Sequence, residues 1–312
     1  MAEIVTLTPN PAIDISTSVD RIVPMRKLRC APQRRDPGGG GVNVARVVKR
    51  FGGDVEAILP VGGFTGQLLR RLINDEEIPH RVIEVEAETR EDFSVSELST
   101  AQQYRFVLPG LPLCEAEWRE CLKALAGTEP RPKFVVGSGS LPPGVPNDFY
   151  AQAAAIARKL GAKFIVDTSG APLAVAMEHG VYMIKPNLRE MRDLVGVELL
   201  NQNDWIIAAR EYINAGKVEV VALSLGHLGA LLVTRDQALR SQALPIKPVS
   251  AVGAGDSFLG AMIFSLAKGK SLTDAFRLGM AAGSSALINE GTELCRPADA
   301  YRLYATATIE SV

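Results

Sequence analysis

The chain has 312 residues, of which 47% are hydrophobic and 22% are charged, and its formal net charge is −1. This composition predicts a globular protein with a sizeable core, organised as one large domain or two smaller ones. A near-neutral charge provides no basic surplus for nucleic acid, and no apolar run approaches the ~20 residues that span a bilayer. The N-terminus lacks the basic and apolar segments of a signal peptide, so we expect a cytoplasmic protein.

The histidines and cysteines suggest no metal centre. The 4 cysteines form no CxxC pair, and the 3 histidines share no ligand spacing. We therefore expect reduced cysteines with mostly structural roles and no structural zinc.

The N-terminal part begins with a strand pattern and a glycine loop. Residues 4–8 alternate and are rich in β-formers, and Asp14 follows this strand and its Pro9-Asn10-Pro11 turn. The glycines at 38–41 precede a helical pattern. Glycine loops let backbone N–H groups approach a ligand closely. Asn43, at the start of that helix, offers an amide that could hydrogen-bond such a ligand.

Two β-rich excursions, at about 12–36 and 89–108, interrupt an otherwise regular β/α alternation. We expect both insertions to form a small antiparallel β lid, although the first could equally be a solvated strand pair. Such a lid has exposed apolar positions to cover, which predicts a homodimer formed through it.

Strands and helices alternate regularly from residue 114 onward. Apolar runs of this length, alternating with helices, predict a parallel sheet with helices on both faces. Ligands bind in such folds at the carboxyl ends of the strands, where polar residues are concentrated here. The expected strands are 134–136, 164–166, 181–184 and 218–223, and the expected helices are 118–125, 151–160, 258–266, 276–287 and 298–304.

We place the chemistry in the stretch 251–260. Two glycines and an alanine, at 253–255, stand where an apolar helix must begin. The first N–H groups of a helix have no partner inside it, and the helix dipole adds to their attraction for an anion. Asp256 lies among them, where a carboxylate suits a general base better than a phosphate ligand. The alternative is an aspartate that only caps a glycine-rich turn.

Several nucleotide-binding classes are excluded by their missing motifs. The chain contains no P-loop sequence, and the glycines at 253 and 255 lack the rest of a dinucleotide fingerprint. The H-R-D and D-F-G triplets of protein kinases are also absent.

Five motifs, in order, resemble those of the ribokinase-like (PfkB) carbohydrate kinases. They cover nearly the whole chain, and within the family the sequence is most similar to the bacterial phosphofructokinase branch. The motifs are Gly38-Gly39-Gly40-Gly41-x-Asn43-x-Ala45, Asp167-Thr168-Ser169-Gly170, Lys185-Pro186-Asn187-x-x-Glu190, Ser224-Leu225-Gly226-x-x-Gly229-Ala230 and Val252-Gly253-Ala254-Gly255-Asp256-Ser257-Phe258.

The resemblance implies an α/β fold, namely a ribokinase-like three-layer α/β/α sandwich with a mostly parallel central sheet and a small β-sheet lid. It implies a single kinase domain over residues 1–312. The implied reaction is ATP-dependent phosphorylation of a ketose phosphate, in the first place fructose 6-phosphate to fructose 1,6-bisphosphate. ATP and Mg²⁺ are the implied cofactors, with K⁺ as a further candidate.

The resemblance also implies a role for individual residues on the sugar side. Asp256 would take the proton from the sugar hydroxyl, beside an anion hole of backbone N–H groups. The residues of the anion hole would be Gly253, Ala254 and Gly255. The sugar hydroxyls would be held by Asp14, Gly39 and Asn43. The substrate's phosphate would be bound by Arg90, Lys27 and Ser140, with Arg105, Arg29 and Ser138 as less certain candidates.

Further residues are implied on the nucleotide side. Glu190 would organise Mg²⁺ through water. The nucleotide would be bound by Lys185, Asn187, Ser224, Gly226, Gly229 and Gly255, with Asn289 nearby, and K⁺ would be bound by backbone groups of Ser250, Val252, Ala286, Asn289, Gly291 and Glu293.

The choice of substrate stays open at this point. Arginines suit an already phosphorylated sugar, because guanidinium groups bind phosphate with two parallel hydrogen bonds. Tagatose-6-phosphate kinase and 1-phosphofructokinase are the enzymatic alternatives. A nucleotide-binding regulatory protein is the non-enzymatic alternative, and the intact Asp256 and Lys185 count against it.

Overall fold

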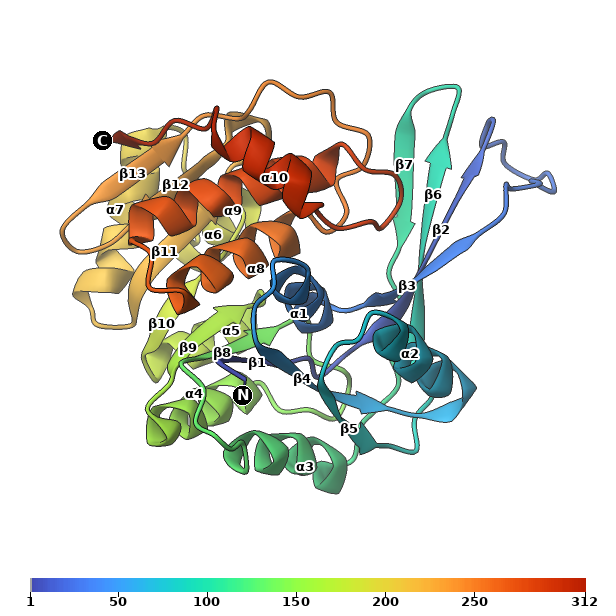
Figure 1. Ribbon diagram of the computed structural model, residues 1–312, viewed down its shortest axis with the longest axis horizontal. Helices are drawn as coiled ribbons and strands as arrows, with labels where there is room; N and C mark the ends of the chain where they lie inside the picture. The colour runs from blue at the N-terminus through green and yellow to red at the C-terminus, as the bar shows by residue number, and fades with distance from the viewer. Residues whose placement is uncertain (1) are drawn as a thin grey trace.

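The computed structural model describes residues 2–312, which form a ten-stranded main sheet with helices on both faces (Figure 1). The strand order is β14-β13-β12-β11-β10-β9-β8-β1-β4-β5. Neighbours from β11 to β5 pair in parallel, and β12 to β14 add an antiparallel edge. The strands are β1 (Ile4–Leu7), β4 (Val55–Val61), β5 (His80–Glu84), β8 (Phe134–Ser138), β9 (Lys163–Asp167), β10 (Val181–Ile184), β11 (Val218–Ser224), β12 (Ala230–Val233), β13 (Ala238–Ser241) and β14 (Glu310–Ser311).

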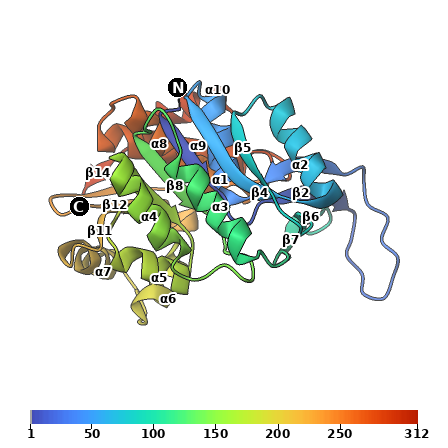
Figure 2. The same cartoon turned by 90° about the horizontal axis from the view of Figure 1, so that it is seen from below.

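Alternation along the buried strands divides the core between the two faces of the sheet. Val5 and Leu7 of β1 pack with α3 to α7, whereas Ile4 packs with α1, α2, α8 and α9 on the opposite face. Figures 1 and 2 show α3 and α4 across the sheet from α8, α9 and α10. The helices are α1 (Gly40–Arg50), α2 (Gly63–Asp75), α3 (Glu115–Ala126), α4 (Phe149–Leu160), α5 (Ala171–Glu178), α6 (Leu188–Val195), α7 (Gln202–Asn214), α8 (Ala254–Ala267), α9 (Leu272–Leu287) and α10 (Pro297–Tyr304).

A second, four-stranded sheet projects from one end of this sandwich, in the order β3-β2-β6-β7. The expected antiparallel arrangement is wrong for its central pair, because β2 and β6 run parallel. Both strands leave the carboxyl edge of the main sheet, one after β1 and the other after β5, and so they start from the same side. The strands are β2 (Ala12–Val19), β3 (Arg34–Gly38), β6 (Arg90–Glu97) and β7 (Gln102–Phe106).

The three-layer sandwich with a mostly parallel sheet is confirmed, and each strand and helix expected after residue 114 is present. Helices α5 to α7 and the β12–β13 hairpin were not predicted. The start of α7 carries a readable signal, since Asn201 accepts hydrogen bonds from the N–H groups of Asn203 and Asp204. None of the helices within residues 2–312 is long and apolar enough to cross a membrane.

The cysteines divide into two groups. Cys121 and Cys295 are buried, whereas Cys30 and Cys114 are exposed, and all are free thiols. A structural packing role therefore applies to two of them, which is fewer than the sequence suggested.

Candidate active site

Asp256 lies in the first turn of α8, as the sequence predicted. The helix begins at Ala254, and Gly253 precedes it with φ 72°, a left-handed conformation that favours glycine. A Cβ on Gly253 would also collide with the side chain of Leu294. No side chain caps this helix start. Its first N–H groups are therefore available to an anion, as expected for a phosphate-binding helix terminus.

The carboxylate of Asp256 is held from α1. Asn43 Nδ2 donates a hydrogen bond to Asp256 Oδ2 at 2.9 Å. Burial raises the pKa of Asp256, while the Asn43 hydrogen bond and the charges of Lys185 and Arg105 oppose that rise. The result is a half-buried carboxylate near two cations, an environment typical of a functional acid or base.

Lys185 lies at the same helix start. A Cβ on Gly255 would lie 3.2 Å from Lys185 Nζ, so the ammonium group sits directly against the amide-lined turn. Its partner is Asp167 at the end of β9, with Nζ and Oδ1 3.2 Å apart. Burial raises the pKa of Asp167, and Lys185 lowers it. The sequence analysis assigned no role to Asp167. Its position, directly after the expected strand at 164–166, could have marked it as a candidate site residue.

Asp14 of β2 faces Asp256 from the lid side. Its pKa is raised to about 7, first by burial and then by the nearby charges of Asp92 and Asp256. Gly38 makes room for this carboxylate, since a Cβ there would overlap its atoms. The structure thus brings Asp14 and Asp256 together from opposite ends of the sequence, and it adds Asp92, which the sequence did not single out.

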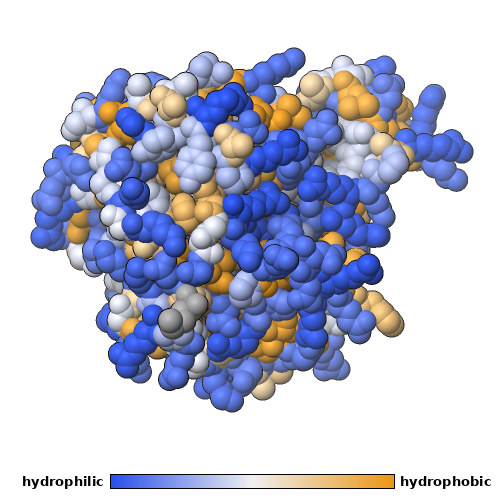
Figure 3. Space-filling view, in the orientation of Figure 1, coloured by the Kyte–Doolittle hydropathy of each residue, from blue (hydrophilic) through white to orange (hydrophobic). Residues whose placement is uncertain are grey.

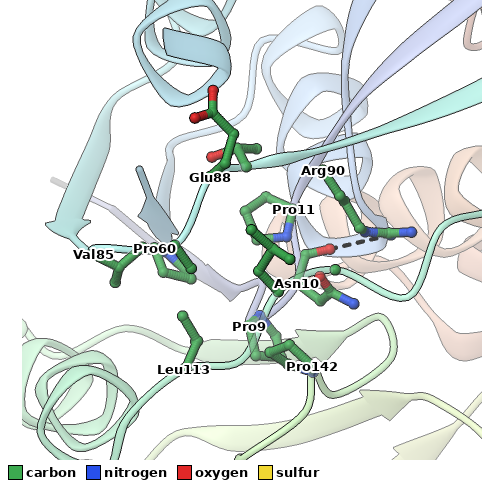
Figure 4. Close-up of a pocket in the computed structure, with 13 residues that line it drawn as sticks. Pro9, Asn10, Pro11, Pro60, Val85, Glu88, Arg90, Leu113 and Pro142 are labelled. Atoms are coloured by element: carbon green, nitrogen blue, oxygen red, sulfur yellow. Dashed lines mark hydrogen bonds between the residues drawn. The ribbon is translucent and has the colours of Figure 1, made fainter. Parts of the chain in front are cut away.

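Arg90 forms a second cluster at the root of the lid. Its guanidinium pairs with Asp92 at 2.8 Å and donates to the carbonyl of Leu108 at 2.7 Å. It also donates to the Asn10 carbonyl at 3.3 Å, and Asn10 Nδ2 donates to Ser140 Oγ at 3.1 Å. Figure 4 shows Arg90 beside Asn10 at the edge of a pocket lined by prolines. The structure therefore brings together Arg90 and Ser140, both predicted to meet a phosphate.

Ser138, the alternative to Ser140, occupies a different environment. It is buried and hydrogen-bonds to Asp167, whereas Ser140 is exposed. Gly40 lies so close that a Cβ there would collide with Ser138 Oγ. Ser138 consequently packs the glycine loop against the end of β9.

The remaining basic candidates do not gather around Arg90. Ala12 of β2 pairs with Arg90, and Val19 pairs with Glu97 seven residues further along. At about 3.3 Å per residue this distance is roughly 23 Å. Lys27 and Arg29 belong to the exposed loop that extends beyond Val19, so within one chain they lie at the far end of the lid from Arg90.

Arg105 lies closer to the predicted base. It is exposed on β7, yet its charge lowers the pKa of both Asp14 and Asp256. Gly39, the remaining sugar-side residue, precedes α1 with φ 100°, and a Cβ there would collide with Thr8.

The predicted nucleotide residues meet at the carboxyl ends of β10 and β11. Asn187 and Glu190 cap α6 reciprocally, with Asn187 Oδ1 accepting from the Glu190 N–H at 2.9 Å and Glu190 Oε2 accepting from the Asn187 N–H at 2.8 Å. Ser224 forms a β-bridge with Asn187. Gly226 and Gly229 follow in a tight turn, with φ of 60° and 95°.

The segments predicted to bind K⁺ also meet. Ser250 Oγ donates to the Gly291 carbonyl at 2.6 Å, and the Ser250 N–H donates to the Leu287 carbonyl at 3.2 Å. Asn289 is buried and donates through Nδ2 to the Leu294 carbonyl at 3.0 Å. The loops that carry Val252 and Glu293 therefore lie beside the end of α9, which carries Ala286.

The side chains available as ligands indicate how Mg²⁺ could be bound. Residues 2–312 contain no group of three or more His, Cys, Asp or Glu side chains that could hold a metal ion. Mg²⁺ keeps several waters and often binds through substrate phosphates with few protein carboxylates. One oxygen of Glu190 accepts from the cap of α6, which leaves the other for a water on such an ion. The residues fit an ion carried by a nucleotide rather than a protein cage.

Comparison with protein families gives an independent result. Residues 8–299 match the pfkB family of carbohydrate kinases. The chain belongs to this family, and the resemblance drawn from the five motifs is confirmed.

Individual relatives define the branch. The chain is 48% identical over 304 residues to the ATP-dependent 6-phosphofructokinase isozyme 2 of Mycobacterium tuberculosis, covering 97% of this chain and 89% of that protein. It is 42% identical over 306 residues to the isozyme 2 of Escherichia coli K12, covering 98% and 99%. The crystal structure of Escherichia coli phosphofructokinase-2 in complex with substrates and products superimposes with a TM-score of 0.94, at 42% identity and the same coverage. The predicted similarity to the bacterial phosphofructokinase branch is therefore confirmed.

Proposed function

We propose that this protein is an ATP-dependent 6-phosphofructokinase, which converts fructose 6-phosphate to fructose 1,6-bisphosphate. The observation that carries the proposal is the position of Asp256 in the first turn of α8, between Asp14 and Lys185. A carboxylate, an amide-lined helix start and a lysine are the groups that phosphoryl transfer to a hydroxyl requires. The relatives named 6-phosphofructokinase support the choice of substrate.

In this proposal Asp256 is the general base. The sugar hydroxyl gives its proton to the carboxylate while its oxygen forms a bond to the γ-phosphorus, and the bond to the β,γ-bridging oxygen breaks to release ADP. A positioned base is worth roughly 10²–10⁴ in rate. Because a sugar hydroxyl is a weak acid, the proton moves as the transition state forms.

The backbone N–H groups of Gly253, Ala254 and Gly255 would face the oxygens of the phosphoryl group in flight. Each such donor is worth on the order of 10²–10³ in rate where charge develops. Lys185 adds a positive charge at the same helix start. Asp167 keeps that lysine in place through their ion pair.

Asn187, Ser224, Gly226 and Gly229 are proposed to bind the nucleotide at the carboxyl ends of β10 and β11. Magnesium bound to the nucleotide would neutralise phosphate charge, and Glu190 would hold one of its waters. The loops of Ser250 and Gly291 are proposed to bind K⁺ through carbonyl groups. The Escherichia coli phosphofructokinase-2 has been crystallised in complex with potassium, which supports that assignment.

On the sugar side, Asp14 and Gly39 are proposed to hold hydroxyl groups. Asn43 keeps one amide hydrogen for the same purpose, since the other is donated to Asp256. Arg90 is proposed to bind the substrate's phosphate. Its side chain is 10% exposed and its Nε has no hydrogen-bond partner within residues 2–312, which leaves a donor available.

We also propose that the protein forms a homodimer through the lid sheet. Hydrophobic residues gather over the end of this sheet in Figure 3. Leu98, just beyond the end of β6, is 65% exposed, and Phe106 of β7, which pairs with Phe93 of β6, is 54% exposed. Exposed large apolar side chains on one sheet suggest an interaction surface. An inhibited form of the Escherichia coli phosphofructokinase-2 is a tetramer, so assembly of that protein is known.

A substrate panel tests the proposed function. Initial rates of ADP release are compared for fructose 6-phosphate, tagatose 6-phosphate, fructose 1-phosphate and unphosphorylated fructose. We expect the highest kcat/KM with fructose 6-phosphate. Preference for fructose 1-phosphate would mean that the phosphate site is arranged for the other end of the sugar. No turnover with any of these ketoses would favour the regulatory alternative.

A further inference from the structure

Arg46 of α1 is completely buried, an unusual position for a charged side chain. Its Nε and Nη2 both donate to Glu76 Oε1, at 2.9 and 2.5 Å. Its Nη1 donates to the carbonyl of Pro37 at 2.9 Å and to Asn43 Oδ1 at 3.2 Å. Its Nη2 also lies 3.5 Å from Asp36 Oδ1. Each of the guanidinium's five N–H donors thus has an acceptor, and the group is held in one orientation.

The contact between Arg46 and Asn43 decides which way the Asn43 amide faces. Arginine can only donate hydrogen bonds, and an ionised carboxylate can only accept them. Asn43 stands between these two groups, with Oδ1 toward Arg46 and Nδ2 toward Asp256 at 2.9 Å. Only this orientation of the amide satisfies both neighbours.

We infer that Arg46 is a positioning residue for the phosphoryl transfer: it fixes the Asn43 amide so that an N–H, and not the carbonyl oxygen, faces Asp256. The inference rests on the proposed function, since it presumes that Asp256 acts as the base. Arg46 acts through Asn43, because the hydrogen bonds of its guanidinium go to Asn43, Pro37, Glu76 and Asp36 and none goes to Asp256.

Loss of the guanidinium removes the constraint on the amide. A flipped Asn43 would place Oδ1 against the carboxylate, so a charge-assisted hydrogen bond would become a repulsion. The ionised form of Asp256 would lose its principal hydrogen bond, and its pKa would rise above the value that burial already sets. The charged groups that face Asp256 are Arg46 from α1, Lys185 after β10, Arg105 from β7, Asp14 from β2 and Asp167 from β9.

Arg46 also has a structural role, which the experiment must separate from positioning. Asp36 belongs to β3 at the root of the lid, and Glu76 follows α2 directly. The guanidinium therefore ties both elements to α1. A loss of stability alone would say nothing about Asn43, and the readouts must include the pH dependence of catalysis.

A double-mutant cycle with Arg46→Lys and Asn43→Ala tests the inference. Lysine keeps the charge but cannot reproduce the paired geometry of the guanidinium. We expect Arg46→Lys to lower kcat about tenfold or more, and to move the acidic limb of the kcat profile upward by about half a pH unit or more. The KM for ATP should stay within about twofold. The double variant should be no slower than Asn43→Ala alone, within about twofold, because Arg46 acts through Asn43.

Two further variants keep the test decisive. Arg81→Lys changes another arginine, which bridges Glu56 and the Ala124 carbonyl, and should leave the pH profile of kcat unchanged. Glu76→Gln weakens the anchor of the guanidinium without removing it, and should move the acidic limb in the same direction by less. If thermal melting shows that Arg46→Lys is not folded, Glu76→Gln becomes the deciding variant.

The outcomes separate the inference from the proposed function. An unmoved acidic limb in folded Arg46→Lys and Glu76→Gln, or effects that multiply in the double variant, would overturn the role of Arg46 while the wild type remains an active kinase. Absence of turnover in the wild type with every ketose phosphate would instead overturn the proposed function.

Discussion

At the scale of single residues, the site concentrates carboxyl groups where burial makes ionisation costly. The pKa values of Asp14, Asp167 and Asp256 are all raised, with burial as the first cause. Lys185 and Arg105 offset part of this cost without cancelling it. Functional sites often retain such unfavourable electrostatics because the reaction needs them.

Asp14 gives a stability prediction with a definite sign. Its pKa is about 7 in the folded protein against an ordinary value of 3.8, so folding favours its protonated form. Its contribution to stability is complete below the unfolded pKa and is lost as the pH rises through about 7. Asparagine does not ionise, so Asp14→Asn should be more stable than the wild type at high pH. The difference in the free energy of unfolding between variant and wild type should be about 2 kcal/mol larger at about pH 8 than at about pH 5, measured by urea denaturation. An equal gain at both pH values would contradict the raised pKa.

Arg90 gives a kinetic prediction. Its pairing with Asp92 and its buried Nε suit a residue that binds the substrate's phosphate. Arg90→Ala should raise the KM for fructose 6-phosphate about tenfold or more and change kcat much less, because a phosphate contact is made in both ground and transition states. ADP affinity, measured by calorimetry, serves as the control. An unchanged KM would mean that the sugar phosphate binds elsewhere.

Motif reading identified the site residues that lie next to one another in the sequence or in a family motif. Asp256, Asn43 and Lys185 were found in this way, and the structure brings all three together. Asp92 and Arg46 were not found. The i,i+3 spacing of Asn43 and Arg46 on α1 permits their contact, but only the fold shows that Arg46 is buried and bonded to Glu76 and Asp36 from other elements.

At the scale of elements, the start of α8 is the decisive feature. Gly253 needs a left-handed backbone, whereas Gly255 is helical and its hydrogen faces Lys185 Nζ. The two positions therefore require glycine for different reasons. Gly253 permits the turn, and Gly255 leaves space for an ammonium group and an anion.

This difference yields a prediction for Gly255→Ala. Alanine is the better helix former, so the melting temperature should be equal to that of the wild type or higher. The added methyl group would lie 3.2 Å from Lys185 Nζ and push it from the helix start. We expect kcat to fall about tenfold with the fold intact. Wild-type kcat in this variant would mean that Lys185 need not touch the anion hole.

Long apolar strands and helices were predictable because their periodicity is strong. The eight-residue α5 and α6 and the β12–β13 hairpin were missed, since short elements carry little periodicity. The 13-residue α7 was also missed, although the cap at Asn201 marks its start. The start of α8 was expected at residues 253–255 and the helix begins at Ala254, although the apolar pattern itself covered only 258–266. Glycine has a low helix propensity, so a glycine-rich first turn does not resemble a helix.

At the scale of the whole molecule, the lid sheet contacts the loops that surround the base. Gln103 of β7 donates to Ser250 Oγ at 3.2 Å. Thr292 Oγ1 donates to Asp36 of β3 at 2.7 Å, and Arg34 pairs with Glu293 at 3.3 Å. These contacts fix the lid against the C-terminal loops, so the small sheet and the main sheet enclose one site.

The exposed apolar end of the lid predicts the effect of a charge there. Leu98→Asp should convert a dimer to a monomer in sedimentation velocity experiments, because a carboxylate in an apolar interface is costly. Leu200→Asp alters an exposed leucine before α7 and should leave the oligomeric state unchanged. A Leu98→Asp protein that remains dimeric would place the interface on another surface.

The account depends most on Asp256 as the base, and kcat of Asp256→Asn tests this directly. Asparagine keeps the shape of the side chain but cannot accept the proton. With fructose 6-phosphate and ATP, coupled to ADP detection, we predict that kcat falls at least about 10²-fold while ADP still binds with wild-type affinity by calorimetry. Turnover near the wild-type rate in this variant would contradict the account.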